Sequence, residues 1–453
     1  MTDFAAIDKY IEDHLDDSIA ELSRLCAQPS VSAQGLGMRE CAELVAEMLR
    51  RRGFAVEIMA TDGHPVVYGE AAGDSDKTLL FYNHYDVQPP EPLELWDSPP
   101  FEPALRDGKL FARGASDDKG HIQCRLSALD AIKAARGSYP CRIKFVIEGE
   151  EETSSVNLDA FVRNNTEKLK ADACVWEFGG VNYEGRPTQH LGLRGICYVE
   201  LTARTATRDA HSGLGGSLFA NAAWRLVWAL NTLKGPDERI RIPGHYDNVK
   251  PPNAKDWELL AALPDESETI KEMYGLKGFL NDMTGGPEMR MKESFLPTCT
   301  ICGLTSGYQG PGSKTVLPAT ASAKVDFRLV PDQTPEEVLE KLRRHLDAEG
   351  FGDIEIAYLG GEAPGKTDPD DPFVKLTLDA AREVYGSEPI VYPMIGGSGP
   401  NAVFLEMLKL PIVSAGVGYP ESQAHAPNEN MVLDHFVTGT KHTARIVERF
   451  AER

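Results

Sequence analysis

With 453 residues, 42% of them apolar and 26% charged, the chain is too long for one hydrophobic core and has the composition of a globular protein with two domains. Its 47 Lys and Arg against 69 Asp and Glu give a net charge of −22, which disfavours nucleic acid or an anionic membrane as a partner. Long apolar runs are absent, so we expect no membrane-spanning helix, and the N-terminal segment lacks the basic and apolar regions of a secretory signal.

The first third of the chain alternates helical and strand-like segments. The predicted helices cover residues 7–25, 38–52 and 122–135, and the predicted strands cover residues 78–82, 142–147 and 173–176. This alternation is typical of an α/β layer with a mostly parallel sheet.

After residue 192 the pattern changes to alternating, half-exposed strands at 195–203 and 324–330, with a clear helix at 221–233 between them. The α/β pattern then resumes with a helix at 373–385, a strand at 389–391, a helix from 401 and a strand at 411–414. We therefore predict an α/β domain formed by residues 1–191 and 363–453, interrupted by an inserted α+β domain at residues 192–362.

The eight cysteines lack the spacing of a disulfide scaffold, and we therefore expect a reducing, cytoplasmic location. Cys299 and Cys302 form one C-x-x-C pair, and no second pair accompanies it. We interpret these two as residues of a buried strand rather than as a zinc or redox site.

Five short segments place metal-binding side chains just after strand-like runs. They are NHYD (83–86), SDDKG (116–120), GEEE (149–152), WEFGG (176–180) and AHAPNEN (424–430). Because ligand-binding residues gather beyond the carboxyl ends of parallel strands, these segments can converge on one site. Two histidines with several carboxylates and no cysteine suit a catalytic site for zinc, manganese or cobalt.

Each segment alone carries little weight, because H-x-D is usually a surface pair and GEEE a solvated turn. Their conjunction is what indicates a metal site. His84 and Asp86 point to the same side of an extended chain, so Asp86 can hold the far nitrogen of His84. Asp117 could bridge two cations, and Glu152 could be a terminal ligand while Glu151 stays free to handle a proton. Glu177 and His425 would complete the ligand set.

The segments YNHYDVQPP, ARGASDDKG and EGEEETSS together resemble the M20 family of co-catalytic zinc peptidases, close to its cytosolic, carnosinase-like dipeptidase branch. The resemblance spans nearly the whole chain, including the inserted lid domain through which that family forms homodimers. It implies two divalent metal ions, with Zn²⁺ the first choice and Mn²⁺ or Co²⁺ the alternatives. The implied ligands are His84, Asp117 as the bridge, Glu152, Glu177 and His425.

The same resemblance implies roles for residues beyond the ligands. Asp86 would be the orienting acid and Glu151 the general base, and the Asp117–Asp118 peptide bond would be cis. His211, in RDAHSGLGG, would reach the active site of the partner subunit. The residues expected to contact substrate are Arg328 in VDFRLVP, Gly397 and Ser398 in GGSGP, and Thr315 across the dimer.

The chemistry of paired cations predicts a mechanism. A water held between them would have its pKa drawn toward neutrality, so that Glu151 can take its proton and pass it to the leaving nitrogen. The developing oxyanion needs a further donor, and the family resemblance implies that His211 supplies it. We therefore expect a hydrolase for the amide bond of dipeptides or short peptides with a free C-terminal carboxylate. A non-catalytic metal-binding protein is the less favoured class, because it would not need a free Glu151 beside Glu152.

One departure from the dipeptidase branch affects the expected substrate. That branch usually reads R-E-G-G-S, whereas this chain has Met394-Ile395-Gly396-Gly397-Ser398. An ammonium group at this place would have no charged partner. The alternative function is therefore an N-acyl-amino-acid amidohydrolase or a carboxypeptidase of the same family.

Overall fold

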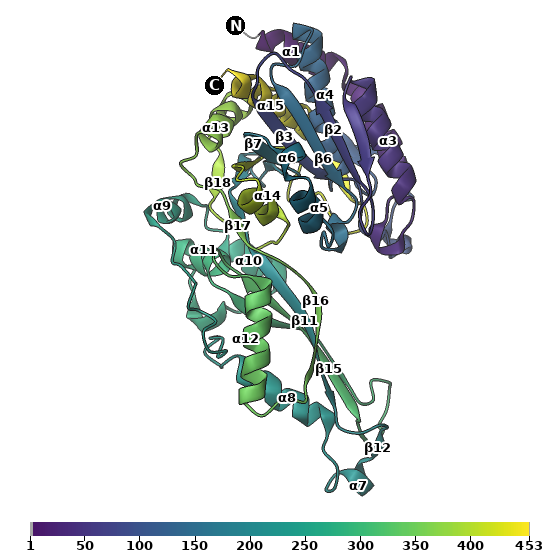
Figure 1. The fold of residues 1–453 in the computed structure, drawn as a ribbon, viewed down its shortest axis with the longest axis vertical. Coiled ribbons are helices and arrows are strands. Elements are labelled where there is room, and N and C mark those ends of the chain that lie inside the picture. Colours follow the sequence, from purple (N-terminus) through teal and green to yellow (C-terminus); the bar gives the residue numbers. More distant parts are fainter. Residues whose placement is uncertain (1–2, 453) are drawn as a thin grey trace. The chain divides into compact units, whose positions relative to one another are not determined.

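The computed structural model describes residues 3–452, which divide into two compact units (Figure 1). Unit 1 holds the described residues up to 192, residues 366–393 and those from 400 onward. Unit 2 holds residues 193–365 and 394–399. The short segment 394–399 thus belongs to unit 2 although the chain on both sides of it belongs to unit 1.

A six-stranded sheet with the order β1-β2-β6-β3-β7-β19 forms the centre of unit 1. Its strands are β1 Ala55–Met59, β2 Val66–Ala71, β3 Thr78–His84, β6 Arg142–Glu148, β7 Ala173–Trp176 and β19 Ile412–Ser414. The strands from β6 to β19 are parallel, and β1 and β2 add an antiparallel edge. The predicted α/β class with a mostly parallel sheet is therefore confirmed, and four parallel strands end at the same edge.

The residues of β3 explain why it lies in the middle of the sheet. All seven are buried, as expected for a strand that is covered on both faces. On one face Tyr82 stacks on Trp176 with ring centroids 4.1 Å apart, and on the other face Phe81 stacks on Phe145 at 5.0 Å.

Helices cover both faces of this sheet (Figure 1). On the Phe81 face lie α3 Met38–Arg51, α4 Lys119–Arg136 and α15 Leu433–Ala451. Helices α1 Phe4–Asp13, α2 Leu15–Ala27 and α13 Pro372–Tyr385 pack against them. On the Tyr82 face lie α5 Leu158–Asn164, α6 Thr166–Leu169 and α14 Asn401–Met407. Two three-stranded sheets flank this core: β4 Ala104–Arg106, β5 Lys109–Phe111 and β20 Asn430–Val432, and β8 Gly180–Val181, β9 Pro187–His190 and β18 Ile390–Tyr392.

The apolar repeat that we predicted as one helix at 7–25 forms two, α1 Phe4–Asp13 and α2 Leu15–Ala27. His14 separates them with φ −111° and ψ 20°, outside the helical region. Its ring stacks on Tyr10 and its Nδ1 lies 2.9 Å from the Tyr10 carbonyl oxygen. The apolar spacing continues through this break, so the pattern could not reveal it.

Unit 2 is built on a four-stranded antiparallel sheet with the order β13-β15-β11-β16. These strands are β11 Gly195–Arg204, β13 Thr298–Ser306, β15 Thr320–Leu329 and β16 Glu355–Glu362. Helices α8 Ala222–Leu233 and α12 Pro335–Ala348 pack on one face, where Cys197, Val199 and Leu201 of β11 meet Val325 and Phe327 of β15.

The rest of unit 2 consists of short elements. They are β12 Ala210–His211, β14 Val316–Leu317, α7 Ser212–Gly215, α9 Ala254–Ala262, α10 Ser267–Tyr274 and α11 Gly286–Phe295. The C-x-x-C pair lies on β13, an edge strand, where Cys299 is buried but Cys302 is exposed, so the expectation of two buried residues was wrong for Cys302. Within residues 3–452, no helix is both long and apolar enough to span a lipid bilayer.

Candidate active site

The predicted metal ligands lie in unit 1, at the edge where the parallel strands end. His84 is the last residue of β3, Glu151 and Glu152 lie in a short turn after β6, Glu177 follows β7, Asp117 precedes α4, and His425 lies in the loop before β20. This convergence is what the position of the five segments after strand-like runs predicted.

His84, Asp117 and Glu152 each place one ligand atom within 4.8 Å of the others, a grouping that suits a divalent cation. His84 Nε2 lies 3.1 Å from Asp117 Oδ1. His425 Nε2 lies 3.0 Å from Asp117 Oδ2 and 3.2 Å from Glu152 Oε2. Each carboxylate oxygen of Asp117 therefore faces a different histidine.

These contacts shift the protonation of the cluster. Hydrogen bonds to Asp117 and Glu152 raise the pKa of His425 to about 10. Burial alone would raise the pKa of the Asp117 carboxyl, but the hydrogen bonds from His425 and His84 outweigh it and hold this pKa well below its usual range. Asp117 is therefore an ionised carboxylate at neutral pH, which is the form that binds cations.

Glu177 is the ligand candidate with an unsatisfied atom. It is 6% exposed, and its Oε2 has no hydrogen-bond partner in the described part of the chain. Burial and the charge of Glu151 raise the pKa of Glu177 well above its usual value. Because buried carboxylates that interact electrostatically repel one another, an orphaned oxygen among them fits a site whose charge is balanced by cations.

Glu151 is near the cluster without being tied to it. Its Oε2 lies 4.0 Å from His84 Nε2, and no hydrogen bond to its carboxylate occurs among the described residues. Burial, followed by the charges of Glu152 and Asp117 and opposed by His84, raises its pKa well above the usual value. A carboxyl group with a raised pKa holds a proton more readily than an ordinary carboxylate does, which suits a group that transfers protons.

Asp86 is fully buried and holds two parts of the site together. His84 Nδ1 lies 3.0 Å from the Asp86 carbonyl oxygen and 3.4 Å from its Oδ1, so the backbone is a closer partner than the predicted carboxylate. The Asp86 carboxylate also accepts the backbone N–H groups of Glu151 at 3.2 Å and Glu152 at 3.0 Å. It therefore fixes both the histidine and the turn that carries the two glutamates.

The turn that carries these glutamates starts at Gly149. The chain passes so close to Tyr85 there that a Cβ would lie 2.3 Å from the Tyr85 hydroxyl oxygen, a separation that only glycine avoids. Tyr85 is itself fixed, because its hydroxyl donates to the Pro65 carbonyl oxygen at 2.8 Å.

Two acidic residues of the site were given no side-chain role by the sequence analysis. The buried carboxylate of Glu429 accepts hydrogen bonds from the Arg113 guanidinium and from the N–H groups of Gly114, Ser116 and Asp117, at 2.8 to 2.9 Å. It therefore clamps the loop that presents Asp117. The only signal for it was its place in AHAPNEN, four residues after His425.

Asp118 is the second of these residues. Its Oδ2 accepts hydrogen bonds from Asn83 Nδ2 at 2.6 Å and from the His84 N–H at 3.1 Å, which joins the end of β3 to the loop before α4. The Asp117–Asp118 peptide bond is cis, as the family resemblance implied.

The predicted substrate contacts lie in unit 2, in two groups. Arg328 Nη1 donates to Ser398 Oγ at 2.8 Å, and the Gly397 carbonyl accepts the Arg194 N–H at 2.9 Å, so the structure brings β15 and the 394–399 segment together. His211 and Thr315 form the other group, with Nε2 and Oγ1 3.3 Å apart.

These two groups are far apart within unit 2. Position 328 is near one end of β15, and His211 and Thr315 lie beyond its other end at Thr320. At about 3.3 Å per residue, eight residues of strand separate them by roughly 26 Å.

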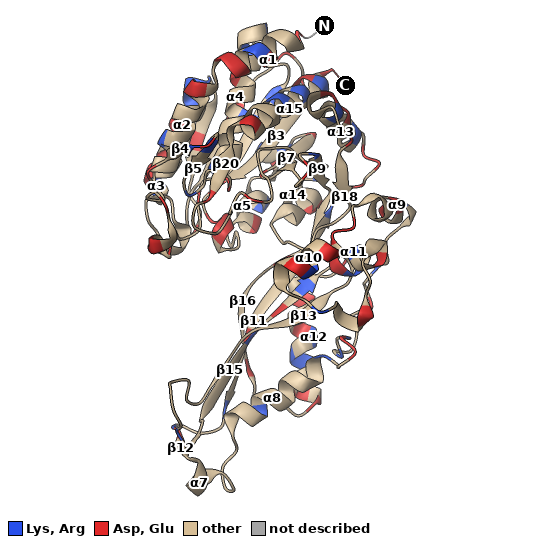
Figure 2. Cartoon of the chain, turned by 180° about the vertical axis from the view of Figure 1, so that it is seen from behind, with Lys and Arg blue, Asp and Glu red and all other residues tan. Residues whose placement is uncertain are grey.

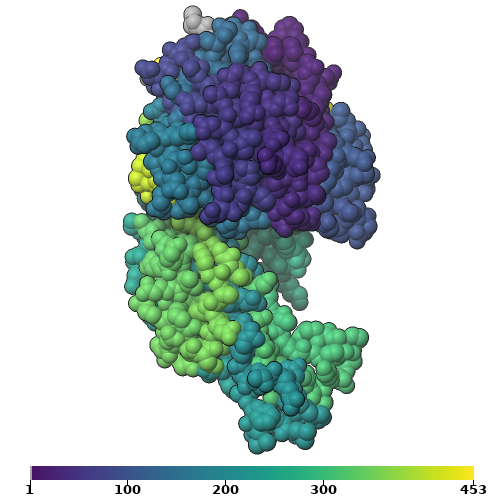
Figure 3. Space-filling model, turned by 45° about the vertical axis from the view of Figure 1, so that its right-hand side comes forward, coloured from purple at the N-terminus to yellow at the C-terminus, as the bar shows by residue number. Residues whose placement is uncertain are grey.

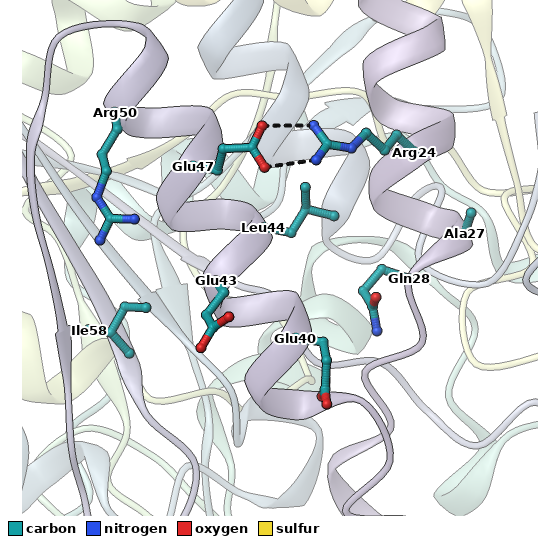
Figure 4. A pocket seen from close by; sticks show the side chains of 9 residues that line it. All are labelled: Arg24, Ala27, Gln28, Glu40, Glu43, Leu44, Glu47, Arg50 and Ile58. Atoms are coloured by element: carbon teal, nitrogen blue, oxygen red, sulfur yellow. Dashed lines mark hydrogen bonds and ion pairs between the residues drawn. The ribbon is translucent and has the colours of Figure 1, made fainter.

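A groove elsewhere in unit 1 offers different chemistry. It lies between α2 and α3, and its lining carries ion-paired groups such as Arg24 and Glu47, whose Nη2 and Oε2 atoms are 2.8 Å apart (Figure 4). Neither histidine nor cysteine is among the residues that line it. The strand-end cluster is therefore the better candidate for a catalytic site.

Comparison with known proteins identifies the family of the chain. The family model described as "Peptidase family M20/M25/M40" matches residues 80–449. The Cys-Gly metallodipeptidase of Schizosaccharomyces pombe is 30% identical over 95% of both chains, and the Beta-Ala-His dipeptidase of Homo sapiens is 28% identical over 96% of this chain and 90% of its own.

Among solved structures, an M20 family metallo-carboxypeptidase from Sulfolobus solfataricus matches with a TM-score of 0.91 and 37% identity, over 96% of this chain and 99% of its own. These matches extend through both units and confirm the resemblance inferred from the sequence. The strand ends carry a cluster that could hold a metal ion, a second unit is inserted in the first, and the family model matches residues 80–449. The chain belongs to peptidase family M20/M25/M40.

Proposed function

We propose that this chain is a two-metal hydrolase that cleaves the amide bond of dipeptides or short peptides beside a free C-terminal carboxylate. The observation that carries the proposal is the cluster of His84, Asp117 and Glu152 with the unbonded carboxylate of Glu151 beside it. The relatives named above as a Cys-Gly metallodipeptidase and a Beta-Ala-His dipeptidase support dipeptides as the substrate class.

The donor set supports two divalent cations, Zn²⁺ in first place and Mn²⁺ or Co²⁺ as alternatives. His84, Glu177 and Asp117 would hold one, and His425, Glu152 and Asp117 the other, since each oxygen of Asp117 faces one histidine. Bound cations would supply Lewis acidity to the scissile carbonyl and to an attacking water.

Glu151 is the group that we assign to proton transfer. Its raised pKa and its freedom from hydrogen bonds allow it to accept a proton from the attacking water and to donate it to the leaving nitrogen. Asp86 acts as a positioning residue, because it holds the backbone of Glu151 and fixes the ring of His84.

Arg328 and Ser398 would bind the free carboxylate of the substrate. A guanidinium presents a planar pair of donors that matches a planar anion, and the Ser398 hydroxyl adds a third donor within reach. Gly397, in the same loop, would contribute its backbone.

His211 and Thr315 would serve the active site of a partner subunit. A dipeptide spans only about 7 Å, so groups about 26 Å apart in one unit cannot both contact one substrate molecule. The long β-sheet of unit 2 therefore favours a homodimer in which each chain lends His211, as an oxyanion donor, to its partner.

Unit 2 offers an apolar surface for such a dimer. Near His211 the side chains of Leu214 and Leu218 are 78% and 77% exposed, and Trp224 and Trp228 of α8 are 57% and 55% exposed. Figure 3 shows the segment around residues 210–220 projecting from unit 2, and Figure 2 shows little charge on α7 and α8. Edge strand β13 adds Ile301, which is 52% exposed. Apolar groups of this size commonly mark interfaces.

A cytoplasmic location is part of the proposal, supported by eight cysteines that are all free of disulfides. A carboxypeptidase is the second candidate function. The Sulfolobus solfataricus metallo-carboxypeptidase favours it, as do the uncharged residues Met394 and Ile395, which leave room for a blocked or longer acyl side.

The test is Glu151→Gln, assayed on free dipeptides, longer peptides and N-acyl amino acids, with metal content measured by mass spectrometry. The variant is expected to retain the metal of the wild type while its kcat falls at least about 100-fold, the usual scale of a lost general base. Glu184→Gln, at an exposed position, is the matched control. A wild-type protein that holds two metal ions yet cleaves none of these substrates would contradict the proposal.

A further inference from the structure

The segment at 394–398 has no charged side chain, yet a dipeptide carries an ammonium group as well as a carboxylate. An ammonium that leaves water without a partner is destabilised by several kcal/mol, so a site for such a substrate needs an acid somewhere near Arg328.

The sheet of unit 2 places one acid beside Arg328. Arg328 on β15 lies directly opposite Ile196 on β11, and Ile196 lies directly opposite Glu362 on β16. Residues in such a row point to the same face of a sheet. Arg328 and Glu362 are two strand spacings apart, so their Cα atoms are separated by about 10 Å. The neighbouring row of Phe327, Cys197 and Gly361 faces the helices, so Arg328 and Glu362 share the opposite face.

The Glu362 carboxylate has no hydrogen bond or ion pair among the described residues, although it is partly buried. Burial raises the pKa of Glu362 to about 7, and Arg328 opposes the rise. The missing contacts and the raised pKa both indicate that the Glu362 carboxylate has no bonded partner, although the Arg328 guanidinium is near enough to lower its pKa.

The other acids of this region already have partners. Asp326 Oδ2 accepts from Arg328 Nε at 3.3 Å, which ties this carboxylate to the guanidinium, although its buried Oδ1 has no hydrogen-bond partner among the described residues. Glu293 lies against the 394–398 loop, with its Cγ 3.9 Å from where a Cβ would stand on Gly396, but its Oε2 is paired with Arg290 Nη1 at 3.0 Å. Of these three acids, only Glu362 has no arginine paired with its carboxylate among the described residues, and it is therefore our candidate for binding a cation.

We propose that Glu362 binds a primary ammonium group of the substrate while Arg328 binds its carboxylate. The inference rests on the proposed function and narrows its substrates to peptides with an ammonium about one dipeptide length, roughly 7 Å, from the C-terminal carboxylate. Both the amino terminus of a dipeptide and the side chain of a C-terminal lysine meet this requirement.

Two matched substrate pairs distinguish these two origins of the ammonium group. Ala-Ala against N-acetyl-Ala-Ala tests the amino terminus, and Ala-Lys against Ala-norleucine tests the lysine side chain. The wild type is expected to prefer the charged member of one pair. Glu362→Gln is expected to lower kcat/KM for that member at least about 10-fold, the scale of a lost buried charge contact, and to change the uncharged member less than about 2-fold.

Glu293→Gln is the matched control, because it removes a nearby acid that is already paired, and it is expected to leave both preferences unchanged. Thermal unfolding checks the fold, and Glu362→Gln is expected to be at least as stable as the wild type, since it removes a partly buried carboxylate that has no partner. If Glu362→Gln alters neither preference, or lowers kcat/KM equally for both members of each pair, the inference is wrong.

Binding separates this inference from the proposed function. Calorimetry with Glu151→Gln protein, with and without Glu362→Gln, measures the same two pairs without turnover. If the protein binds the charged member of a pair more tightly and Glu362→Gln removes this preference, the ammonium site is supported even if the wild type proves inactive. If the wild type cleaves peptides but has no preference for the charged member, the hydrolase is supported and the ammonium site is wrong.

Discussion

Asp86 accepts hydrogen bonds from the backbone of Glu151 and Glu152 and lies beside Nδ1 of His84. One buried carboxylate thus fixes a proposed ligand from β3 and two acids from the turn after β6. Because the metal affinity of a site depends on how firmly its ligands are held, Asp86 influences binding without touching a cation.

Asp86→Asn is expected to weaken metal binding about 10- to 100-fold, the usual cost of losing a partner that orients the ligands. The amide retains one acceptor oxygen and so cannot hold both N–H groups as the carboxylate does. Competition with a chelator of known affinity measures the loss, and Asp62→Asn, at an exposed position, is the control. Unchanged affinity in a folded variant would mean that the turn is held by other contacts.

The sequence predicted that the proposed ligand residues converge, because their segments combine a specific motif with a position after a strand-like run. Glu429 escaped prediction for a physical reason. Its partners Gly114 and Asp117 lie more than 300 residues earlier, and no periodicity links a buried acid to backbone N–H groups at that distance.

Helices α13 and α15 contact each other through a buried histidine. His442 of α15 is 4% exposed, its Nε2 lies 3.1 Å from the Thr377 carbonyl oxygen of α13, and its ring packs edge-on against Tyr385. Burial lowers the pKa of His442 to about 4, and the hydrogen bond to Thr377 opposes this only in part.

This histidine is expected to make unit 1 less stable in acid. The unfolded chain binds the proton below about pH 6.5 and the folded chain only below about pH 4, so the free energy of unfolding falls as the pH drops between these values, by about 3 kcal/mol for this group. His442→Gln keeps a donor for Thr377 and cannot titrate. The difference between wild-type and variant urea midpoints should therefore shrink as pH falls from 7 to 4, and a constant difference would contradict the assignment.

At the scale of elements, helices with a clear end signal were predicted closely. Gly386 and Gly137 adopt φ +65° and +85° after α13 and α4, a conformation that ends a helix. The start of β15 was missed, because its first residues, Thr320 to Ala323, are small and carry little hydrophobic alternation. They are strand residues because they pair with β11 and β13, a tertiary effect that local sequence does not encode.

At the scale of the whole molecule, the sequence indicated an interrupted α/β layer but not the strand order. The alternation of helices and strands favours parallel pairing of the strands. It does not give the position of β3 between β6 and β7, because that order depends on which helices cover which face of the sheet. Residues 394–399 show the same limit, since their membership of unit 2 rests on contacts such as that between Ser398 and Arg328.

The proposed dimer can be tested by complementation. His211→Ala is expected to lower kcat at least about 100-fold, the scale of a lost oxyanion donor, with its metal content unchanged. When it is mixed with Glu151→Gln protein and the subunits exchange, hybrid dimers contain one intact site and are expected to recover activity. Mass spectrometry of each variant mixed with wild-type protein tests whether subunits exchange. If subunits exchange but activity does not recover, a site shared between chains is ruled out.

The Glu429 clamp has a consequence for how the protein is made. Glu429 and His425 emerge from the ribosome after all of the inserted unit, whereas His84, Asp117 and Glu152 emerge long before it. Synthesis proceeds at about 5–20 residues per second, so the interval between the first proposed ligands and the last is on the order of tens of seconds. A polypeptide released shortly before residue 425 would therefore contain the complete insert but lack His425 and the Glu429 carboxylate that holds the Asp117 loop, and we expect it to bind metal weakly.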